Sequence, residues 1–422
     1  MIMFTALLGA LFFALGVNAT SAYAAEGEGL QGTLSNQNQP VAGVRINVTQ
    51  NGQPAGSAVS GADGKWTLSV SPGTYEVVLD ESSLPAGVGL QGTLGPTRSL
   101  EVYEGQMRNV LYPLGPVGAG APPPEAEPTI WDRLPNLVYT GVHIGLILAL
   151  GALGVSLIFG TMGLTNFAHG ELITFGALIG FLFNVTIGLP LWLSLILAVV
   201  VGGAFGWLQD RFFWGWLRRR RTGLIGMMIV SIGLAMVLRY VFLFQFRGGT
   251  QQYREYAAQP GIEIGPLLIA PKNLIMDAVA ILVLVAVSVA LLKTRLGKAT
   301  RAVSTNPALA AASGIDVDKI IRLIWTIGGA LAALAGVMLG MFQGLNFQMG
   351  FQILLLVFAA VTLGGLGTAF GALLGSMVVG IVTQVSTLWV PTELKNVGAL
   401  AALIIILLFR PQGILGRRER IG

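Results

Sequence analysis

The sequence contains no cysteine and few charged residues. Only 11% of its 422 residues are Asp, Glu, Lys or Arg, while 54% are hydrophobic and the mean hydropathy is +0.73. Soluble domains carry about 25% charged residues, so this composition excludes a soluble protein and indicates a membrane protein. The lack of cysteine excludes disulfide bonds, thiolate catalysis and cysteine-ligated metal sites.

A second absence concerns ATP. No phosphate-binding loop of the form G-x-x-x-x-G-K-[ST] occurs, and the nearest string, residues 61–66 (GADGKW), has the wrong spacing. We therefore expect that the chain is not an enzyme and binds no cofactor or metal, and that any ATP is hydrolysed by a partner. Its net charge of +5 is typical of nucleic-acid binding but also of basic cytoplasmic loops in membrane proteins. We expect no nucleic-acid partner.

Residues 1–24 predict a signal peptide or an N-terminal anchor. An apolar run over residues 1–16 is followed by small residues and by Ala22-Tyr23-Ala24, which has the form of a cleavage site. No lysine or arginine precedes the run, so an uncleaved anchor remains an alternative. Either version exports the segment that follows.

Residues 30–114 predict a small extracytoplasmic all-β sandwich. Short alternating segments such as residues 44–48 (VRINV) and 65–70 (KWTLSV) are separated by turn signals at Asn51-Gly52, Asp63-Gly64 and Pro72-Gly73. The segment resembles transthyretin-like, carboxypeptidase-regulatory domains, which implies a fold and no activity. Residues 115–135, with three prolines at 122–124, predict a stiff linker.

Residues 136–416 predict a transmembrane domain. Nine hydrophobic segments, most near the ~20 residues that cross a bilayer, cover about 137–160, 164–184, 189–208, 222–244, 273–293, 320–343, 353–367, 369–390 and 395–409. The seventh is short and rich in glycine, which favours a broken or re-entrant helix. The fold class is thus a polytopic α-helical membrane protein of about eight or nine spans, some broken, with an N-terminal β-sandwich.

The distribution of basic residues predicts the orientation. If the sandwich is outside, the cytoplasmic connections hold most of the basic residues and the external ones hold only scattered ones. This agrees with the positive-inside rule and places the C-terminus in the cytoplasm. The basic residues of the cytoplasmic connections are Arg211, Arg218, Arg219, Arg220, Arg221, Arg295, Lys298, Arg301, Lys319, Arg417, Arg418 and Arg420.

The first candidate functional stretch is residues 163–180, GLTNFAHGELITFGALIG. Ionisable residues inside a membrane are costly and usually face a bundle interior or a water-filled path, and Gly160, Gly163 and Gly170 would ease a break in the helix. Two interpretations are open. Either these side chains contact solute directly, or their role is structural or gating. In the plain structural version, Asn166 caps a helix and His169 and Glu171 lie at the headgroups. The candidate residues are Asn166, His169, Gly170, Glu171 and Thr174.

The second candidate stretch is residues 362–375, TLGGLGTAFGALLG. Its string AFGALLG echoes TFGALIG at 174–180, and paired glycine-interrupted segments in two halves are a sign of a transporter's central site. We assign Gly364, Gly365 and Gly367 to translocation or gating. The echo is short, so chance repetition in a sequence of this composition remains an alternative.

The third is the long connection 293–322, KTRLGKATRAVSTNPALAAASGIDVDKIIR. Asn306-Pro307 predicts a helix start, Ser313-Gly314 its end, and Asp316 a cap for the next helix. The pattern favours a short cytoplasmic helix that transmits force from a soluble partner, and a plain solvated connector is the alternative.

Three motifs in order resemble the permease subunits of branched-chain amino acid ABC importers. They are NFAHGE at 166–171, NPALAAASGID at 306–316 and LFRPQGILG at 408–416, and the resemblance covers about 285 residues, from Leu137 to the end. It implies a coupling loop, 294–319, that seats on an ATPase. The implied coupling residues are Arg301, Asn306, Pro307, Ala311, Gly314 and Asp316. Ala310-Ala311-Ala312 stand where the general importer loop has a glutamate, and the N-terminal sandwich is a further departure.

The resemblance also implies the machinery. Expected partners are cytoplasmic ABC ATPase subunits, a second permease subunit, identical or related, an extracytoplasmic solute-binding protein and the lipid bilayer of a prokaryotic plasma membrane. The implied solutes are branched-chain or other aliphatic amino acids, with urea or short amides as the alternative. Two rivals belong to other classes: an ion-coupled secondary carrier, which the scarcity of other membrane carboxylates disfavours, and a sensor, which would need an output domain after Arg410.

Overall fold

The fold was analysed in a computed structural model. The structure describes residues 29–36, 39–50, 52–71, 73–91, 95–102, 107–116, 129–246, 248–255, 261–265, 267–391, 394, 396–397, 400–401, 404–405, 408 and 413–415. The described residues form two compact units that divide between Thr129 and Ile130. The predicted signal segment, 1–24, lies outside the described residues.

The first unit is built from strands. Its sheets have the orders β5-β4-β7-β9, β10-β1-β6 and β3-β2-β11-β8, and within the first sheet all pairs are antiparallel, with Ile46 opposite both Ala58 and Leu79. The strands are β1 Gly29–Thr33, β2 Ser35–Asn36, β3 Gln39–Pro40, β4 Arg45–Gln50, β5 Gln53–Val59, β6 Lys65–Ser69, β7 Gly73–Leu79, β8 Val88–Leu90, β9 Thr97–Val102, β10 Met107–Asn109 and β11 Leu114–Pro116, with a short 3-10 helix at Glu81–Ser83.

The core of this unit lies between two sheets. Leu30 and Trp66 from the β1 sheet and Val48 and Val77 from the β4 sheet are buried together, because alternate residues of each strand face inward. Tyr112 joins them and donates its hydroxyl hydrogen to the Val77 carbonyl oxygen at 2.7 Å. Burial raises the pKa of Tyr112 to about 12. The predicted β-rich N-terminal region is therefore confirmed.

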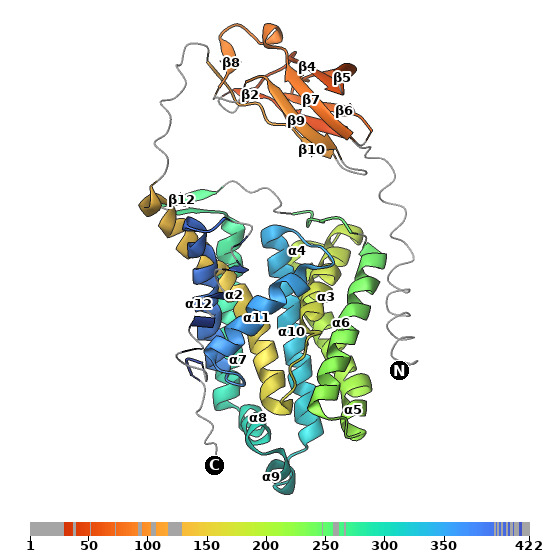
Figure 1. The fold of residues 1–422 in the computed structure, drawn as a ribbon, viewed down its shortest axis with the longest axis vertical. Coiled ribbons are helices and arrows are strands. Elements are labelled where there is room, and N and C mark those ends of the chain that lie inside the picture. Colours follow the sequence, from red (N-terminus) through yellow and green to blue (C-terminus); the bar gives the residue numbers. More distant parts are fainter. Residues whose placement is uncertain are drawn as a thin grey trace. The chain divides into compact units, whose positions relative to one another are not determined.

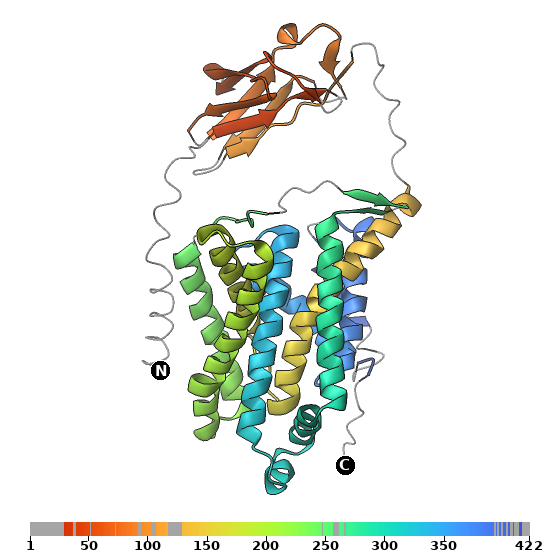
Figure 2. The same ribbon diagram turned by 180° about the vertical axis from the view of Figure 1, so that it is seen from behind.

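The second unit is a bundle of helices (Figures 1 and 2). Its elements are α2 Ile130–Met162, α3 His169–Phe181, α4 Leu191–Gln209, α5 Gly215–Arg219, α6 Leu224–Phe246, α7 Pro271–Lys293, α8 Arg295–Thr305, α9 Pro307–Ala312, α10 Val317–Gln343, α11 Met349–Gly364 and α12 Ala369–Val385. π-helical turns, η2 Leu182–Thr186 and η3 Asp210–Trp214, extend α3 and α4, a 3-10 turn, η4 Ser386–Leu388, follows α12, and a hairpin, β12 Ile262–Ile264 and β13 Leu267–Ile269, precedes α7.

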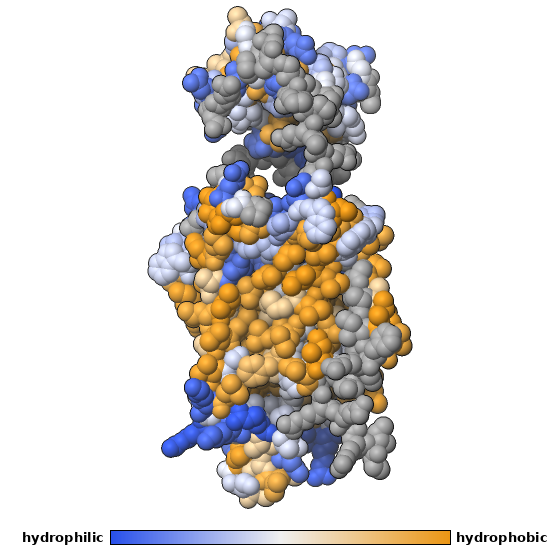
Figure 3. All heavy atoms as spheres, turned by 90° about the vertical axis from the view of Figure 1, so that its left-hand side faces the viewer, coloured by the Kyte–Doolittle hydropathy of each residue, from blue (hydrophilic) through white to orange (hydrophobic). Residues whose placement is uncertain are grey.

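Seven of these helical runs are long and apolar enough to cross a membrane, and α11, with 16 residues, is shorter. On the side that carries α12, Figure 3 shows a hydrophobic band with hydrophilic residues gathered at both of its ends. The polytopic helical fold is thus confirmed. Of the ninth predicted segment, 395–409, only part lies within the described residues.

The structure corrects three boundaries. Residues 164–168 are not helical, so α3 begins at His169 rather than near residue 164. The arginines at 211 and 218–219, predicted to lie in a loop, continue the α4 helix through η3 and α5. The predicted linker is shorter than 115–135, because Gly115 and Pro116 belong to β11 and α2 begins at Ile130; its residues 117–128 lie outside the described part of the chain.

Glycines allow the helices to pack closely. A Cβ added at Gly141 of α2 would lie 2.7 Å from the Ile381 Cα of α12, and one at Gly329 of α10 would lie 2.5 Å from the Gly202 carbonyl oxygen of α4. In lipid, where apolar burial gives little driving force between helices, such close backbone contacts hold a bundle together. Close packing of this kind accounts for part of the abundance of glycine, which numbers 58 residues in the whole sequence.

Candidate functional site

Two helices of the membrane unit end in the same way, although they lie far apart in the sequence. α2 ends before Gly163, with φ +66°, and α10 ends before Gly344, with φ +80°. Glycine adopts this left-handed region without a Cβ penalty, so each helix can stop there. The residues that follow are nearly the same, GLTNFAHG at 163–170 and GLNFQMG at 344–350.

The two asparagines in these segments also form the same kind of hydrogen bond. The Asn166 Oδ1 atom accepts a hydrogen bond from the Ala168 backbone at 3.0 Å, and the Asn346 Oδ1 atom accepts one from the Gln348 backbone at 2.9 Å. Each forms an Asx turn, which directs the chain into the next helix. α3 and α11 therefore begin through the same local geometry, and the two halves of the unit share an N-F-x-x-G start.

The two segments enter the bundle from opposite ends and meet. α2 and α10 run in opposite directions, with Gly163 at the end that carries α8 and α9 and Gly344 at the other end (Figure 1). The segments converge at Gly170 and Gly350, where a Cβ on Gly170 would lie 2.6 Å from the Gly350 carbonyl oxygen. Thr174 links the two helix starts, because its Oγ1 atom accepts from the Gly350 backbone nitrogen at 3.0 Å.

His169 lies at mid-depth in the bundle. Its Nε2 atom donates to the carbonyl oxygen of Gly151, which is in the middle of α2, at 3.2 Å, and the side chain is fully buried. The interpretation that His169 and Glu171 lie at the headgroups is therefore wrong, because the segment 163–168 returns into the bundle instead of continuing along the membrane surface. Asn166 does make a local turn, but α3 has no side-chain cap at its start.

Glu171 forms an ion pair inside this region. Its Oε1 atom accepts from Arg239 of α6 twice, from Nε at 3.1 Å and from Nη2 at 2.9 Å, while its Oε2 atom has no hydrogen bond. The Arg239 guanidinium lies 3.8 Å from the ring centroid of Phe351, the residue after Gly350. Arg239 thus links the first turn of α3 to the first turn of α11.

The sequence interpretation missed this arginine, and it gave no role to Asp210 and Asp277. Both lie within helices of spanning length. Asp210 binds Arg218 at 2.6 Å and Asp277 binds His143 at 2.6 Å. Asp210 and Asp277 lie toward the ends of their helices, so the mean hydropathy of the segment stayed high in spite of them. Asp277 thus ties α7 to α2, and Asp210 reaches α10 through Arg322, at 3.7 Å.

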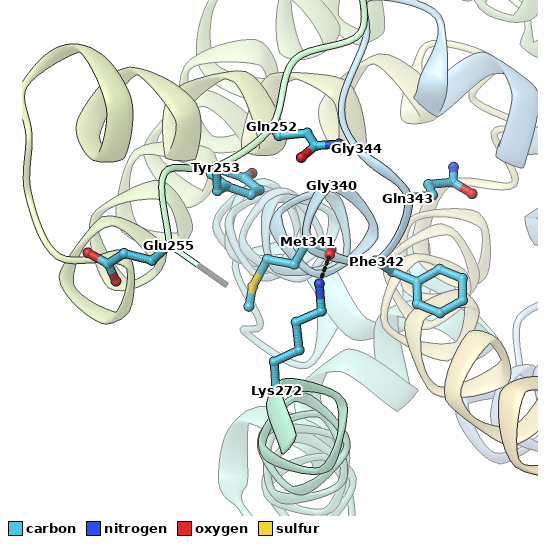
Figure 4. A pocket seen from close by; sticks show the side chains of 9 residues that line it. All are labelled: Gln252, Tyr253, Glu255, Lys272, Gly340, Met341, Phe342, Gln343 and Gly344. Carbon is cyan, nitrogen blue, oxygen red and sulfur yellow. Dashed lines mark hydrogen bonds between the residues drawn. The ribbon is translucent and has the colours of Figure 1, made fainter. Parts of the chain in front are cut away.

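A pocket of about 220 Å³ lies at the end of the unit where α10 stops and α7 begins (Figure 4). Lys272 donates to the Met341 carbonyl oxygen at 3.0 Å, and Tyr253 donates to the Ala177 carbonyl oxygen at 3.0 Å. Burial raises the pKa of Tyr253. Gly344 forms one wall, so the pocket opens beside the segment that leads to Gly350. Its lining residues are Gln252, Tyr253, Glu255, Lys272, Gly340, Met341, Phe342, Gln343 and Gly344.

The glycines Gly364, Gly365 and Gly367 are not part of this central group. They lie at the far end of α11, roughly 21 Å from Gly350 at 1.5 Å per helical residue. There Gly367 touches the C-terminal turn of α2, where a Cβ on Gly160 would lie 3.3 Å from the Gly367 carbonyl oxygen and 3.4 Å from the Ser304 Oγ atom of α8. Gly367 therefore sits beside α2, whereas Gly364 packs against Gly371 of α12.

The AFGALLG echo does not mark equivalent positions. Residues 174–180 belong to α3 and residues 369–375 to α12, whereas the helices that share a start are α3 and α11. The repeat that the structure reveals, N-F-x-x-G, was readable in the sequence at 166 and 346. The described part of the terminal motif lies against the end of α11, where the Ile414 backbone nitrogen donates to the Leu363 carbonyl oxygen at 2.7 Å.

The connection 294–319 forms two short helices. Asn306 caps α9, accepting from the Leu309 backbone at 3.0 Å, Gly314 has φ +86°, and Asp316 caps α10, accepting from the Lys319 backbone at 2.9 Å. Arg301 donates to the Leu291 carbonyl oxygen at the end of α7, so it braces the connection. Figures 1 and 2 show α8 and α9 at one end of the bundle.

The surface of α9 is apolar as well as exposed. Pro307 and Ala311 are exposed, and Leu309, which was not among the predicted residues, has 64% of its surface accessible. An exposed leucine flanked by small residues on a capped helix is suited to insertion into a groove of another protein. The described residues contain no cluster of three or more potential metal ligands.

Comparison with known proteins gives a consistent result. The family described as branched-chain amino acid transport system / permease component matches residues 138–408. The branched-chain amino acid transport permease LivH of Escherichia coli K12 is 32% identical over 301 residues, covering 67% of this chain and 95% of LivH, and BraD of Pseudomonas aeruginosa is 32% identical over 310 residues, covering 69% and 98%. PsaBC of Streptococcus pneumoniae, in complex with Fab, aligns over 69% of this chain and 97% of its own at 13% identity, but its TM-score of 0.38 is too low to support an argument.

Proposed function

The chain belongs to the family of branched-chain amino acid permease components, and from this premise we propose that it translocates branched-chain or other aliphatic amino acids in an ATP-driven importer. The observation that carries the proposal is α9, a capped helix with an exposed Leu309. Through α8, α9 is linked to the end of α2 and to α10. An ATPase bound to such a helix could move the helices of the bundle. The chain is a transport subunit and not itself an enzyme.

The orientation and partners follow from this proposal. α8 and α9 face the cytoplasm and receive a pair of ABC ATPases, while the N-terminal β unit and the β12–β13 end face outward, where a solute-binding protein delivers its cargo. A second permease subunit, identical or related, completes the path. The C-terminus is cytoplasmic, in agreement with the basic residues of the predicted cytoplasmic connections.

The proposed mechanism uses the paired helix starts. ATP binding moves the ATPases together, and α9 transmits this movement through α8 to Gly160 and Gly367. Because α11 runs from Met349 to Gly364, three residues before Gly367, movement of its far end would tilt its start against Gly170. The segment 163–168 reaches the centre from one side of the membrane and 344–348 from the other, so a shift between the two starts would close one side and open the other.

A reconstitution experiment tests the proposal. Proteoliposomes that contain this chain with its ATPase and permease companions should accumulate radiolabelled leucine only when ATP and the loaded binding protein are present. Uphill leucine uptake by this chain alone on an ion gradient would instead support the carrier. Urea uptake in place of leucine uptake would support the alternative solute class.

The cysteine-free sequence provides a test of orientation. A single cysteine at Ser313, after α9, should react with a membrane-impermeant thiol reagent only in inverted vesicles, and one at Ser57 of β5 only in intact cells. Both serines are exposed. The opposite pattern would reverse the proposed orientation.

A further inference from the structure

Within the described helices α6 and α11, Arg239 is the single charged side chain, and exposed apolar side chains surround it. Figure 1 shows α11 running obliquely across the bundle, and its first turn meets α6 where Phe351 lies against Arg239. Arg239 of α6 retains 18% exposure of its side chain there, while the residues around it are far more exposed: Met236 56%, Tyr240 66%, Phe351 49% and Leu355 57%. We call these five residues the α6–α11 face.

This face does not fit an ordinary lipid contact. A guanidinium beside acyl chains is costly, and charged groups within membrane spans usually face a polar path or a partner. Arg239 is also held in place from two sides, by the Glu171 Oε1 atom at 2.9 Å and by the Phe351 ring at 3.8 Å. Its Nε and Nη2 atoms both bind Glu171, and its Nη1 atom makes no hydrogen bond within the described part of the chain. A planar donor group therefore remains available at a fixed position.

The position of this donor coincides with the meeting point of the two broken segments. Glu171 follows Gly170 and Phe351 follows Gly350, and these two glycines are in contact. Arg239 would therefore move whenever α3 and α11 shift against each other. The position of a solute-binding group at this point would therefore change at each step of the transport cycle.

We propose that Arg239 receives the carboxylate of the amino acid as it passes along the α6–α11 face, while Met236, Phe351 and Leu355 contact its aliphatic side chain. The proposal rests on the proposed function, because it assumes an amino acid as solute. A guanidinium matches the planar geometry of a carboxylate, and the apolar neighbours match a branched aliphatic chain. Uncharged urea would use neither feature.

The ion pair with Glu171 explains how such a site could avoid trapping its solute. Because Glu171 already occupies two of the guanidinium donors and neutralises its charge, the solute carboxylate obtains only the remaining donors. Binding is therefore brief and weak, which suits a path whose affinity is supplied by a separate binding protein.

The test compares three variants in the reconstituted complex with radiolabelled leucine: Arg239→Gln, Arg239→Lys, and the double variant Arg239→Gln with Glu171→Gln. The double variant removes both charges together, so no buried carboxylate is left unpaired. Assembly is checked by size-exclusion chromatography and by the ATPase activity that the loaded binding protein stimulates. Arg219→Gln, at an exposed arginine of α5, controls for the loss of one positive charge.

We expect leucine transported per ATP hydrolysed to fall at least tenfold in Arg239→Gln and in the double variant, and less in Arg239→Lys. Parental transport by an assembled double variant would overturn this assignment alone, since Arg239 would then only neutralise Glu171. Failure of the parent complex to transport leucine would overturn the proposed function as well. The two failures are distinguishable because the second occurs before any substitution is made.

Discussion

Replacing Gly170 with alanine should disturb the contact between α3 and α11 directly. The added Cβ would lie 2.6 Å from the Gly350 carbonyl oxygen, 2.9 Å from its carbonyl carbon and 3.3 Å from the Leu354 Cβ atom. The oxygen contact is 0.8 Å shorter than the 3.4 Å at which ordinary contact begins. Two of these three atoms belong to backbone, which a rotamer change cannot move, so the helix starts must separate.

The expected cost follows from overpacking in a close-packed interior, about 1–3 kcal/mol. If the contact is present in only one conformation of the transport cycle, the equilibrium between conformations shifts by the same energy, which corresponds to about 5–150-fold. We therefore expect ATP-driven leucine uptake in proteoliposomes to fall by about that factor. If the contact is present in all conformations, the midpoint of thermal unfolding should fall instead, by about 2–4 °C per kcal/mol.

Gly233→Ala is the matched control. Gly233 lies in α6, and nothing within 4 Å would meet its added Cβ. Alanine there should leave both uptake and thermal unfolding unchanged. If Gly170→Ala also matched the parent in both measurements, the Gly170–Gly350 contact would not constrain the protein, and the proposed central site would be refuted.

Three further substitutions test other parts of the molecule. Leu309→Asp should abolish ATP-driven uptake and co-purification of the ATPases, because it places a charge on the exposed apolar surface of α9. Membrane insertion should be unaffected. Retained co-purification would contradict the coupling assignment. Arg218→Met should lower the free energy of unfolding by about 3 kcal/mol, at the low end for a broken buried ion pair. Asp210 is fully buried, and among the described residues its one remaining basic partner would be Arg322, at 3.7 Å. An equal effect of Arg219→Met, at an exposed arginine, would show that loss of charge alone is responsible. Tyr112→Phe should speed amide exchange in β7 about fivefold at neutral pH, equivalent to about 1 kcal/mol for the lost hydrogen bond to Val77, and unchanged exchange would show that this bond contributes nothing.

Features that depend on local chemistry were predictable from sequence. Asn306, Gly314 and Asp316 predicted the ends of the connecting helix, because capping and left-handed glycine involve only neighbouring backbone. The alternating apolar residues of β4 predicted an inward-facing strand for the same reason. Length and hydropathy predicted most membrane helices within a few residues, since a bilayer fixes both.

Partnerships between distant residues were not predictable in this way. Arg239 sits in a segment that reads as one more hydrophobic span, and only folding brings it within 2.9 Å of Glu171. The glycines at 364–367 read like a second half of the central site, yet α11 carries them to the far end of the bundle.

The sequence by itself determined that this chain lies in a membrane, that it bears a β-rich N-terminal region and that a connection with capped helices joins two of its long helices. Composition, period and caps are properties of short segments. Only the tertiary structure decided that 163–168 and 344–348 return into the bundle and meet at Gly170 and Gly350. The path of these two segments depends on which helices pack together. A glycine in the sequence shows that another helix can approach closely there, but it does not show which helix that is.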